Sequence, residues 1–355
     1  MKKKHINNAC MCAFLILLFL SCNDRKKNLL DLFETQQSLK HEIIRLKDGD
    51  YLSRTFGLYK DHDNLIIHNN NGQTYISIFD LKKQKIINQF IKYGNGPQEM
   101  FSPPQSITVQ HNNKLTYLDA QNRIMYEADY SKLDSVKITK SVDLTKTSEL
   151  FLGLIPMAYN YYVGIGLFEK GRYSVLDKNG KNISINFNYP KDNMQQGSNA
   201  QKAMAYQGGL IPNSDKTKFF FYGITSEILE IMQIQKNGSL TKIKDLHFDY
   251  AKYILNDDGK ATVAAAIKKE TKMAFISACA TSKYIYLLYS GRSINGDVNL
   301  AFKSNTILVF DWKGNPTKRY NLDTDVNIIT VSEDDRSVYA IKITTDDTNL
   351  IKFKL

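Results

Sequence analysis

The sequence repeats one unit, in which β-rich runs are separated by short polar turns. The clearest copy spans residues 283–322. Its first run is 284–289 and its second is 305–310, and an Asp-x-x-Gly turn then leads into a third run. Strand, loop, strand, tight turn and strand form an antiparallel meander. The pattern therefore predicts an all-β protein built from successive meanders.

The copies recur at the period of a propeller blade. Their second strands begin near residues 65, 114, 161, 218, 284 and 337, so the spacing is roughly 47 to 66 residues. A four-stranded blade with its loops has such a period. The last copy lacks an outer strand, whereas residues 41–46 have the pattern of a strand without a blade of its own. We therefore predict a six-bladed β-propeller over residues 41–355, with the last blade closed by this N-terminal strand.

Two segments break the repeat. Residues 260–274 are rich in alanine and carry apolar residues near helical spacing. We therefore expect one short helical insertion between blades four and five. Residues 188–203 are polar and contain a glycine, so we expect a long exposed loop there.

The N-terminus has the layout of an export signal. Lysines precede an apolar run of about 11 residues, which is too short for a membrane-spanning helix of about 20 residues. The small residue Ser21 then precedes Cys22, which resembles the lipobox of bacterial lipoproteins, whose cysteine is acylated. We predict a lipoprotein signal peptide at residues 1–21, lipidation at Cys22 and a tether over residues 22–40.

Cysteine usage agrees with an exported chain that has no disulfide. Cys10 and Cys12 leave with the signal peptide, and Cys22 would carry the lipid. Cys279 then remains alone in an apolar run, where a cysteine is usually a small buried hydrophobic residue. The hydrophobic core must therefore stabilise the fold.

The charge and the predicted cellular location limit which partners are expected. The formal charge is +11, and removal of the three lysines at positions 2–4 leaves +8. The remaining lysines are scattered and arginines are few, whereas nucleic-acid-binding faces gather positive charge and use arginine. We expect a monomer at the cell envelope, at the outer rather than the inner membrane. Its partners would be the membrane, through the lipid, and another envelope protein or a glycan, but no nucleic acid.

Short motifs resemble the TolB-like six-bladed propeller lipoproteins of Gram-negative envelopes. The motifs are Gly-Asn-Gly-Pro-Gln-Glu-Met-Phe at 94–101, Phe-Asp-Trp-Lys-Gly-Asn-Pro at 310–316, Tyr-Asn-Leu-Asp at 320–323 and Ser-Val-Tyr-Ala-Ile at 337–341. The first is similar to a Gly-x-Gly-Pro-x-Glu-Phe signature, but here Met100 precedes the phenylalanine. The resemblance covers residues 41–355 and implies the fold, with little indication of an activity.

The candidate chemistry is sparse. The motif at 94–101 lacks the third glycine and the following helix of a phosphate-binding loop, so we expect its glycines to form turns and Glu99 to accept backbone N–H bonds between neighbouring blades. The histidines show no zinc-ligand spacing. We therefore predict no metal, no cofactor and no catalytic residue. Tyr159, Tyr161 and Tyr162 form an aromatic cluster that could stack on sugar rings or pack between strands.

Two kinds of function fit such a chain, and we favour the first. One is a binding or scaffolding module whose ligand is a glycan or a protein. The other is an enzyme, such as a glycan lyase or hydrolase, with its site at the mouth of the central channel. An enzyme needs convergent carboxylates, histidines or tyrosines on the innermost strands. A mouth lined by hydroxyls, amides and aliphatic side chains would instead favour binding.

Overall fold

The computed structural model describes residues 28–47, 49–96, 99–110, 112–192, 197–255, 265–345 and 347–355. The chain divides into two units, residues 1–32 and Phe33–Leu355. The described part of the first unit holds a short 3-10 helix, η1 (Leu29–Leu32). The predicted signal peptide, residues 1–21, and Cys22 lie outside the described residues.

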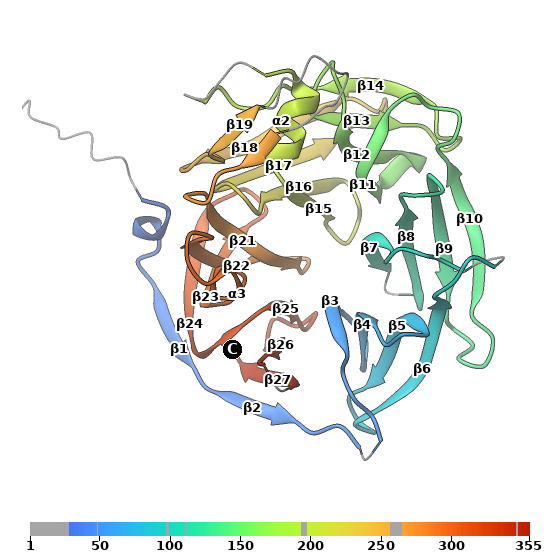
Figure 1. Ribbon diagram of the computed structural model, residues 1–355, viewed down its shortest axis with the longest axis vertical. Coiled ribbons are helices and arrows are strands. Elements are labelled where there is room, and N and C mark those ends of the chain that lie inside the picture. Colours follow the sequence, from blue (N-terminus) through green and yellow to red (C-terminus); the bar gives the residue numbers. More distant parts are fainter. Residues whose placement is uncertain are drawn as a thin grey trace, which may run out of the picture. The chain divides into compact units, whose positions relative to one another are not determined.

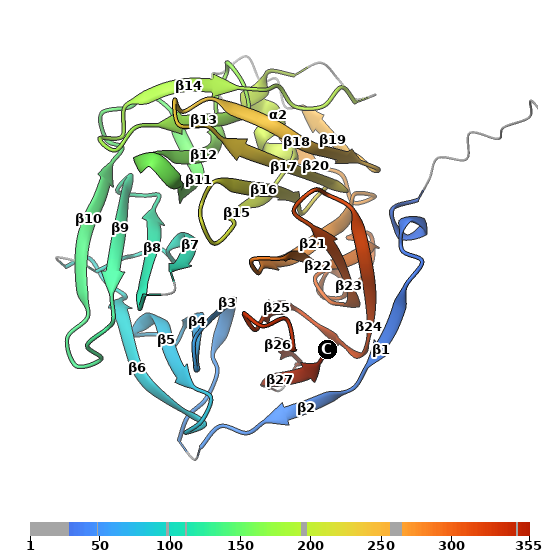
Figure 2. The ribbon, with the colours of Figure 1, turned by 180° about the vertical axis from the view of Figure 1, so that it is seen from behind.

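The second unit is a six-bladed β-propeller, as predicted (Figures 1 and 2). Each blade is an antiparallel sheet of four consecutive strands, completed in the sixth blade by a strand from the N-terminus. The strands nearest the central axis are β3 (Arg54–Asp61), β7 (Gln105–Gln110), β11 (Leu150–Pro156), β15 (Gly208–Pro212), β21 (Lys272–Ala280) and β25 (Ile328–Val331).

The remaining strands complete the blades in chain order. In the first three blades they are β4 (Asn64–Asn70), β5 (Thr74–Asp80), β6 (Lys85–Lys92), β8 (Lys114–Asp119), β9 (Ile124–Asp129), β10 (Lys137–Asp143), β12 (Tyr162–Leu167), β13 (Tyr173–Leu176) and β14 (Asn182–Asn186). In the last three they are β16 (Lys218–Gly223), β17 (Ile228–Ile234), β18 (Leu240–His247), β22 (Tyr284–Ser293), β23 (Ser304–Asp311), β24 (Pro316–Val326), β26 (Ser337–Ile343) and β27 (Thr348–Lys354).

Burial follows the position of a strand within its blade. The middle strands β4 and β5 are buried over five successive residues, because their two faces pack against neighbouring blades. The outer strand β10 is exposed or half-buried except at Val142, and it carries lysines. One apolar cluster, for example, joins blades one and two through Ile66, Ile78 and Leu115. The described core is therefore a series of such clusters between neighbouring blades.

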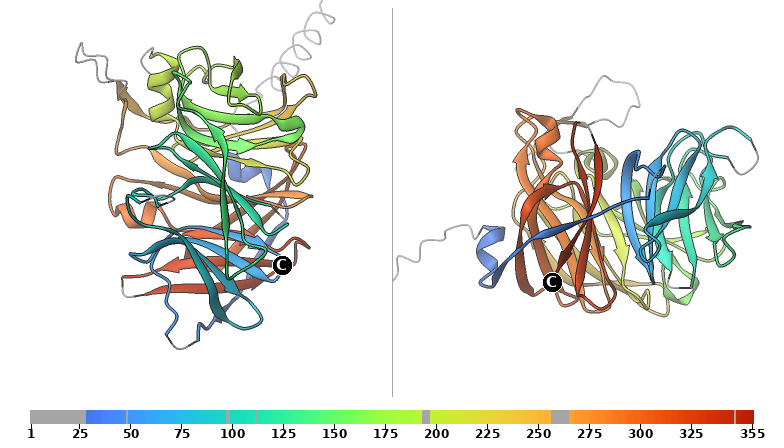
Figure 3. Two further views of the ribbon diagram at one scale, coloured as in Figure 1. Left: turned by 90° about the vertical axis from the view of Figure 1, so that its right-hand side faces the viewer. Right: turned by 90° about the horizontal axis from the view of Figure 1, so that it is seen from below.

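The N-terminal strand closes the ring, and this prediction is confirmed. Strand β2 (His41–Ile44) pairs antiparallel with β27, with Ile43 opposite Ile351 and Ile44 opposite Leu350. It forms the outer edge of the sixth blade (Figure 3). The strand ends at Ile44, two residues earlier than the pattern indicated. Residues about 300 positions apart in sequence therefore share one sheet.

The predicted tether extends too far, because part of it belongs to the propeller. Strand β1 (Gln36–Leu39) pairs in parallel with β24 and adds a fifth strand to blade five. Phe33 is 4% exposed, and its ring centroid lies 5.2 Å from that of Phe310. The polar composition of residues 22–40 concealed these apolar anchors. The propeller therefore begins at Phe33 and not at residue 41.

The prediction of a helical insertion between blades four and five is wrong for the residues that the structure describes. Residues Ala265–Ile267 form strand β20, which pairs with β19 (Tyr253–Leu255), and Lys272 already begins β21. Residues 260–264 lie outside the described residues. Helix propensity differs by less than about 1 kcal/mol per residue between most amino acids. The backbone pairing of β20 with β19 therefore outweighs the helix propensity of the alanines.

A helix forms instead near the end of the predicted loop at residues 188–203. Helix α2 (Asn199–Ala205) lies between blades three and four, and Ser198 and Gln201 form its capping box. The Ser-x-x-Gln spacing is a helix-start signal that the loop prediction did not use. A further short helix, α3 (Val298–Ala301), connects β22 to β23. No helix among the described residues is long and apolar enough to cross a membrane.

Candidate functional site

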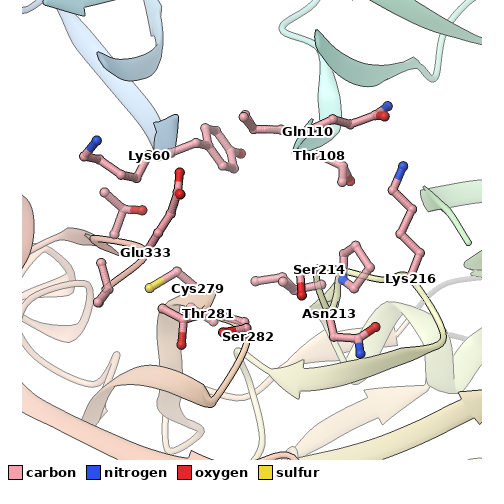
Figure 4. Close-up of a pocket in the computed structure, with 18 of the residues that line it drawn as sticks. Lys60, Thr108, Gln110, Asn213, Ser214, Lys216, Cys279, Thr281, Ser282 and Glu333 are labelled. Atoms are coloured by element: carbon pink, nitrogen blue, oxygen red, sulfur yellow. The ribbon is translucent and has the colours of Figure 1, made fainter. Parts of the chain in front are cut away.

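Five of the innermost strands end at a common cavity. Each is the first strand of its blade, and each is followed by a turn into the second strand. At these carboxyl ends lies a cavity of about 680 Å³, to which five of the six blades contribute. The contributing strands are β3, β7, β15, β21 and β25, together with the turns that follow them. The cavity is the mouth of the central channel (Figure 4).

The cavity is lined mainly by neutral polar and aliphatic groups. Its hydroxyls come from Thr108, Ser214, Thr281, Ser282, Thr330 and Tyr59, and its amides from Gln110, Asn112 and Asn213. Burial raises the pKa of Tyr59, so its phenol stays protonated. Its aliphatic side chains include Ile107, Val109, Leu210, Ile211, Pro212 and Val331. A concave site with apolar walls and a few placed polar groups is typical of a small-ligand pocket. This is the lining that favours binding over catalysis.

Three charged side chains also line the cavity. Lys60 and Glu333 lie on one side in Figure 4, and Lys216 lies on the other. Burial lowers the pKa of Lys60, although Glu333 and nearby aspartates oppose this shift. Burial also lowers the pKa of Lys216, and Glu127 is the acid that opposes it there. Glu127 itself pairs with Lys114 at 2.8 Å. The Lys216 side of the mouth is therefore the more positive one.

Beside the mouth, Asp61, His62 and Glu333 lie close enough to hold a metal ion. Asp61 is fully buried, and one oxygen accepts from Tyr130 Oη at 2.5 Å while the other contacts His62 Nδ1 at 2.7 Å. The hydrogen bond and the charge of Asp61 raise the pKa of His62. The His62 backbone N–H in turn donates to Glu333 at 3.3 Å. These bonds join blades one, two and six, so a structural role accounts for the cluster.

A second group with metal-ligand atoms is Glu230, Asp245 and His247, in blade four. Lys242 Nζ lies 3.5 Å from Glu230 Oε1 and also contacts Asp245. The ammonium therefore already supplies the positive charge that a metal ion would bring. Each group combines two residues that are close in sequence with a third from another strand or turn, so the spacing in the sequence did not indicate the complete group.

The three tyrosines singled out in the sequence do not come together. Tyr159 is exposed in the 3-10 helix η2 (Ala158–Asn160), with φ of 61°. Tyr161 packs against the cluster between blades three and four, and its hydroxyl donates to the Lys236 carbonyl at 3.4 Å. Tyr162 packs on the cluster between blades two and three. Successive residues of a strand point to opposite faces, and none of the three lines the cavity.

Two other residues considered in the sequence, Glu99 and Cys279, have structural roles. Glu99 accepts a backbone N–H, from Gly96 at 2.9 Å, but this bond lies within its own loop and not between neighbouring blades as expected. Gly94 has φ of 155°, and a Cβ there would lie 2.1 Å from the Glu99 carboxylate, so the loop requires glycine. Cys279 lines the cavity, and burial raises the pKa of its thiol. A protonated thiol is a poor nucleophile, so Cys279 is suited to packing.

The cavity residues were missed because they are ordinary turn residues until the ring closes. Asn213, Ser214 and Lys216 lie in a turn that resembles many polar turns in the sequence. The usable signal is positional. The turn after the innermost strand of each blade faces the channel mouth, so correct blade boundaries would have selected these residues.

Comparisons with solved structures agree on the fold. The Bacteroides fragilis structure named "Putative exported protein" has a TM-score of 0.56 and 12% identity, covering 90% of this chain and 99% of that one. A member of the duf4221 family from Bacteroides vulgatus has a TM-score of 0.53 and 9% identity, with coverage of 90% and 96%. Streptogramin B lyase has a TM-score of 0.50 and 14% identity, with coverage of 89% and 98%. No curated protein matches the sequence.

A family model matches most of the propeller. The match is to the TolB-like 6-blade propeller-like family and covers residues 33–334, which begins at the first residue of the propeller unit. The chain therefore belongs to the TolB-like 6-blade propeller-like family.

Proposed function

We propose that the protein is a lipid-anchored binding module of the cell envelope that holds a polar ligand in the mouth of its channel. The observation that carries the proposal is the lining of the cavity, where hydroxyls and amides alternate with aliphatic side chains. Such groups can donate to and accept from a neutral polar ligand without chemistry of their own. A glycan is the ligand class that best matches this mixture, and an envelope protein is the other.

The cellular location is proposed from the N-terminal sequence. Ser21 and Cys22 after a short apolar run support acylation of Cys22. One structure with the same fold bears the name of an exported protein, which agrees with export. We place the lipid in the outer membrane, with the propeller acting as a monomer beyond the tether.

The enzyme alternative has less support. Glycoside hydrolysis uses a pair of carboxylic acids on either side of the bond that breaks. In the described lining of the cavity, Glu333 supplies the carboxylate. Asp61 lies close to Glu333, but it is fully buried and bonded to Tyr130 and His62, so it does not line the cavity. Glu333 also accepts the His62 backbone N–H at 3.3 Å, which ties it to blade one. Binding therefore describes the site better than hydrolysis.

A glycan array tests the binding site. Labelled wild-type chain, residues 23–355, is compared with Ser214→Trp, which places an indole in the cavity mouth, and with Ser148→Trp, on an exposed connector away from the cavity. We expect the wild type and Ser148→Trp to bind the same glycans and Ser214→Trp to lose them. Equal binding by Ser214→Trp would reject the cavity as the site, and a blank array would reject glycans as its ligands.

Acylation is tested separately with Cys22→Ala. Metabolic labelling of the full-length chain with an alkyne fatty acid should label the wild type and leave the variant unlabelled and uncleaved. Cys279→Ala is the control, because it keeps the proposed acceptor and removes another cysteine. Equal labelling of Cys22→Ala and the wild type would contradict the anchor.

A further inference from the structure

The cavity has one corner with the chemistry of an anion site. Thr108 and Gln110 of β7 and Lys216 of the β15–β16 turn lie on the same side of the mouth (Figure 4). They offer a hydroxyl, an amide and an ammonium from two different blades. An ammonium and an amide N–H both donate to an anion, whereas a hydroxyl can donate or accept.

The backbone holds Lys216 in place at this corner. Its N–H donates to the Asn213 carbonyl at 3.0 Å, and its carbonyl accepts the Ala158 N–H from η2 at 2.9 Å. Its φ is 59°, a left-handed conformation that a lysine seldom adopts. These bonds connect the turn to blade three, so the base of the side chain is fixed before a ligand arrives. Because the backbone is already ordered, ligand binding has to order only the side chain of Lys216.

The ammonium of Lys216 is half-buried and under-compensated. In the part of the chain that the structure describes, no carboxylate lies within 4.0 Å of it, and Glu127 is committed to Lys114. Burial of a charge without a close partner is unfavourable, which is consistent with the lowered pKa of this lysine. An anionic ligand would supply the missing partner and form a charge-assisted hydrogen bond.

The rest of the mouth restricts which anion fits. Glu333 lies on the opposite side beside Lys60 and compensates its charge, so that side offers no unpaired positive charge to a second anionic group of a ligand. Phosphate sites usually gather several backbone N–H groups or arginines around one anion, and the described lining contains no arginine. The hydroxyls and amides around the corner instead match hydroxyl groups of the ligand. A single carboxylate on a hydroxylated body meets these conditions.

We infer that the cavity binds a sugar acid of the uronic acid class, with its carboxylate at the corner formed by Thr108, Gln110 and Lys216. The inference rests on the proposed function and specifies its ligand. The ring hydroxyls would then face the amides and hydroxyls of the mouth. The shared chemistry is a uronate, either as a free monosaccharide or as a unit of an acidic glycan chain.

Calorimetric titration of residues 23–355 tests the inference. The probes are galacturonic acid, trigalacturonic acid, the neutral sugar galactose and inorganic phosphate. The variants are Lys216→Gln and the matched control Lys178→Gln, which removes an exposed lysine on a blade-three turn. We expect uronate binding that weakens on the order of 10- to 100-fold in Lys216→Gln and is unchanged in Lys178→Gln. The two galacturonate probes show whether a free sugar or a chain is preferred.

Each other outcome points to a different failure. If galactose binds as tightly as galacturonate and Lys216→Gln changes neither, the uronate inference is overturned while the cavity remains a glycan site. If phosphate competes as well as galacturonate, the carboxylate class is wrong. If galacturonate binds but only Lys178→Gln weakens it, the corner is wrong. If no sugar binds in titration or on the array, both the inference and the glycan form of the proposed function fail.

Discussion

Buried tyrosines connect neighbouring blades through carboxylates. Each hydroxyl donates to an acidic side chain on a neighbouring blade, and burial raises the pKa of each tyrosine. The pairs are Tyr130 with Asp61 at 2.5 Å, Tyr286 with Asp335 at 2.9 Å, Tyr289 with Glu227 at 2.5 Å, and Tyr173 with Glu230. Part of the tyrosine content that indicated strands therefore also fixes how blades pack.

The Tyr130–Asp61 bond gives a direct test of this role. Tyr130→Phe removes the donor and leaves a fully buried carboxylate oxygen without it, so we expect a loss of about 1.5 to 3 kcal/mol in the free energy of unfolding. Tyr162→Phe is the control, because it removes a partly buried hydroxyl pair with Ser141 and should cost about 1 kcal/mol or less. Urea denaturation measures both. Equal losses of unfolding free energy in the two variants would show that the Tyr130–Asp61 bond stabilises the fold no more than the Tyr162–Ser141 bond does.

The ion pair between Arg172 and Glu230 is the most buried one described. The two side chains are 0% and 3% exposed and lie 2.7 Å apart, and the Phe221 ring centroid lies 4.0 Å from the guanidinium. Burial acts to raise the pKa of Glu230, but Arg172 and the hydrogen bonds from His247 and Tyr173 outweigh it and lower the pKa to about 2. The pair therefore links the stability of the fold to pH.

Glu230→Gln should cost about 3 to 5 kcal/mol at neutral pH, because it leaves Arg172 buried without its counter-charge. Because the folded pKa of Glu230 is depressed, its contribution is complete above the ordinary value of 4.5 and is lost as pH falls through about 2. The variant should lack this loss in urea denaturation between pH 5 and 2, within the range where folding is reversible. Glu127→Gln, in a part-exposed pair, should cost below about 1 kcal/mol. A variant as stable as the wild type at pH 7 would contradict the assignment.

Two N-terminal strands, β1 and β2, complete the blades that end the chain. Strand β2 supplies the outer edge of blade six, and β1 extends blade five. Residues 41–355 lack β1, and residues 45–355 lack both strands. We expect the melting temperature to fall at each step, with aggregation of the shorter chain, because its open edge exposes the backbone of β27. Equal melting temperatures for both truncations would contradict closure by β2.

Phe33 tests the revised start of the propeller. Phe33→Ala removes a ring that is 4% exposed and should cost about 3 kcal/mol, measured by urea denaturation. Phe101→Ala, at a ring that is 55% exposed, should change the free energy of unfolding by about 0.5 kcal/mol or less. If Phe33→Ala were equally mild, residues 33–35 would belong to the tether, as the sequence pattern indicated.

The sequence predicted the strands correctly where a pattern repeats, and the prediction failed where a segment occurs only once. Runs such as Tyr75–Phe79 recur in every blade, so period and count gave the ring and even the strand that closes it. Strand β1 and the β19–β20 hairpin occur once, and their pairing partners decide their conformation. Local composition carries no information about such partners, which is why residues 33–40 and 265–274 were assigned incorrectly.

The proposed binding site is formed by the whole ring of blades. Lys216, Thr108 and Glu333 are more than 100 residues apart in sequence and come together only because the blades form a ring. The aromatic cluster at residues 159–162 is adjacent in sequence, yet its members are divided between two faces and a turn. The sequence therefore indicated the channel mouth as a place for function, but not the residues that line it.

Hydrogen exchange tests the location of the ligand most directly. Residues 23–355 are measured alone and with the glycan that gives the strongest array signal. We expect slower exchange in the turns that surround the mouth, at residues 112–113, 213–217, 281–283 and 332–336, and no change in Ser214→Trp. Protection centred on residues 161–162, on the outer strands or on the opposite face, with these turns unchanged, would contradict a ligand site in the channel mouth.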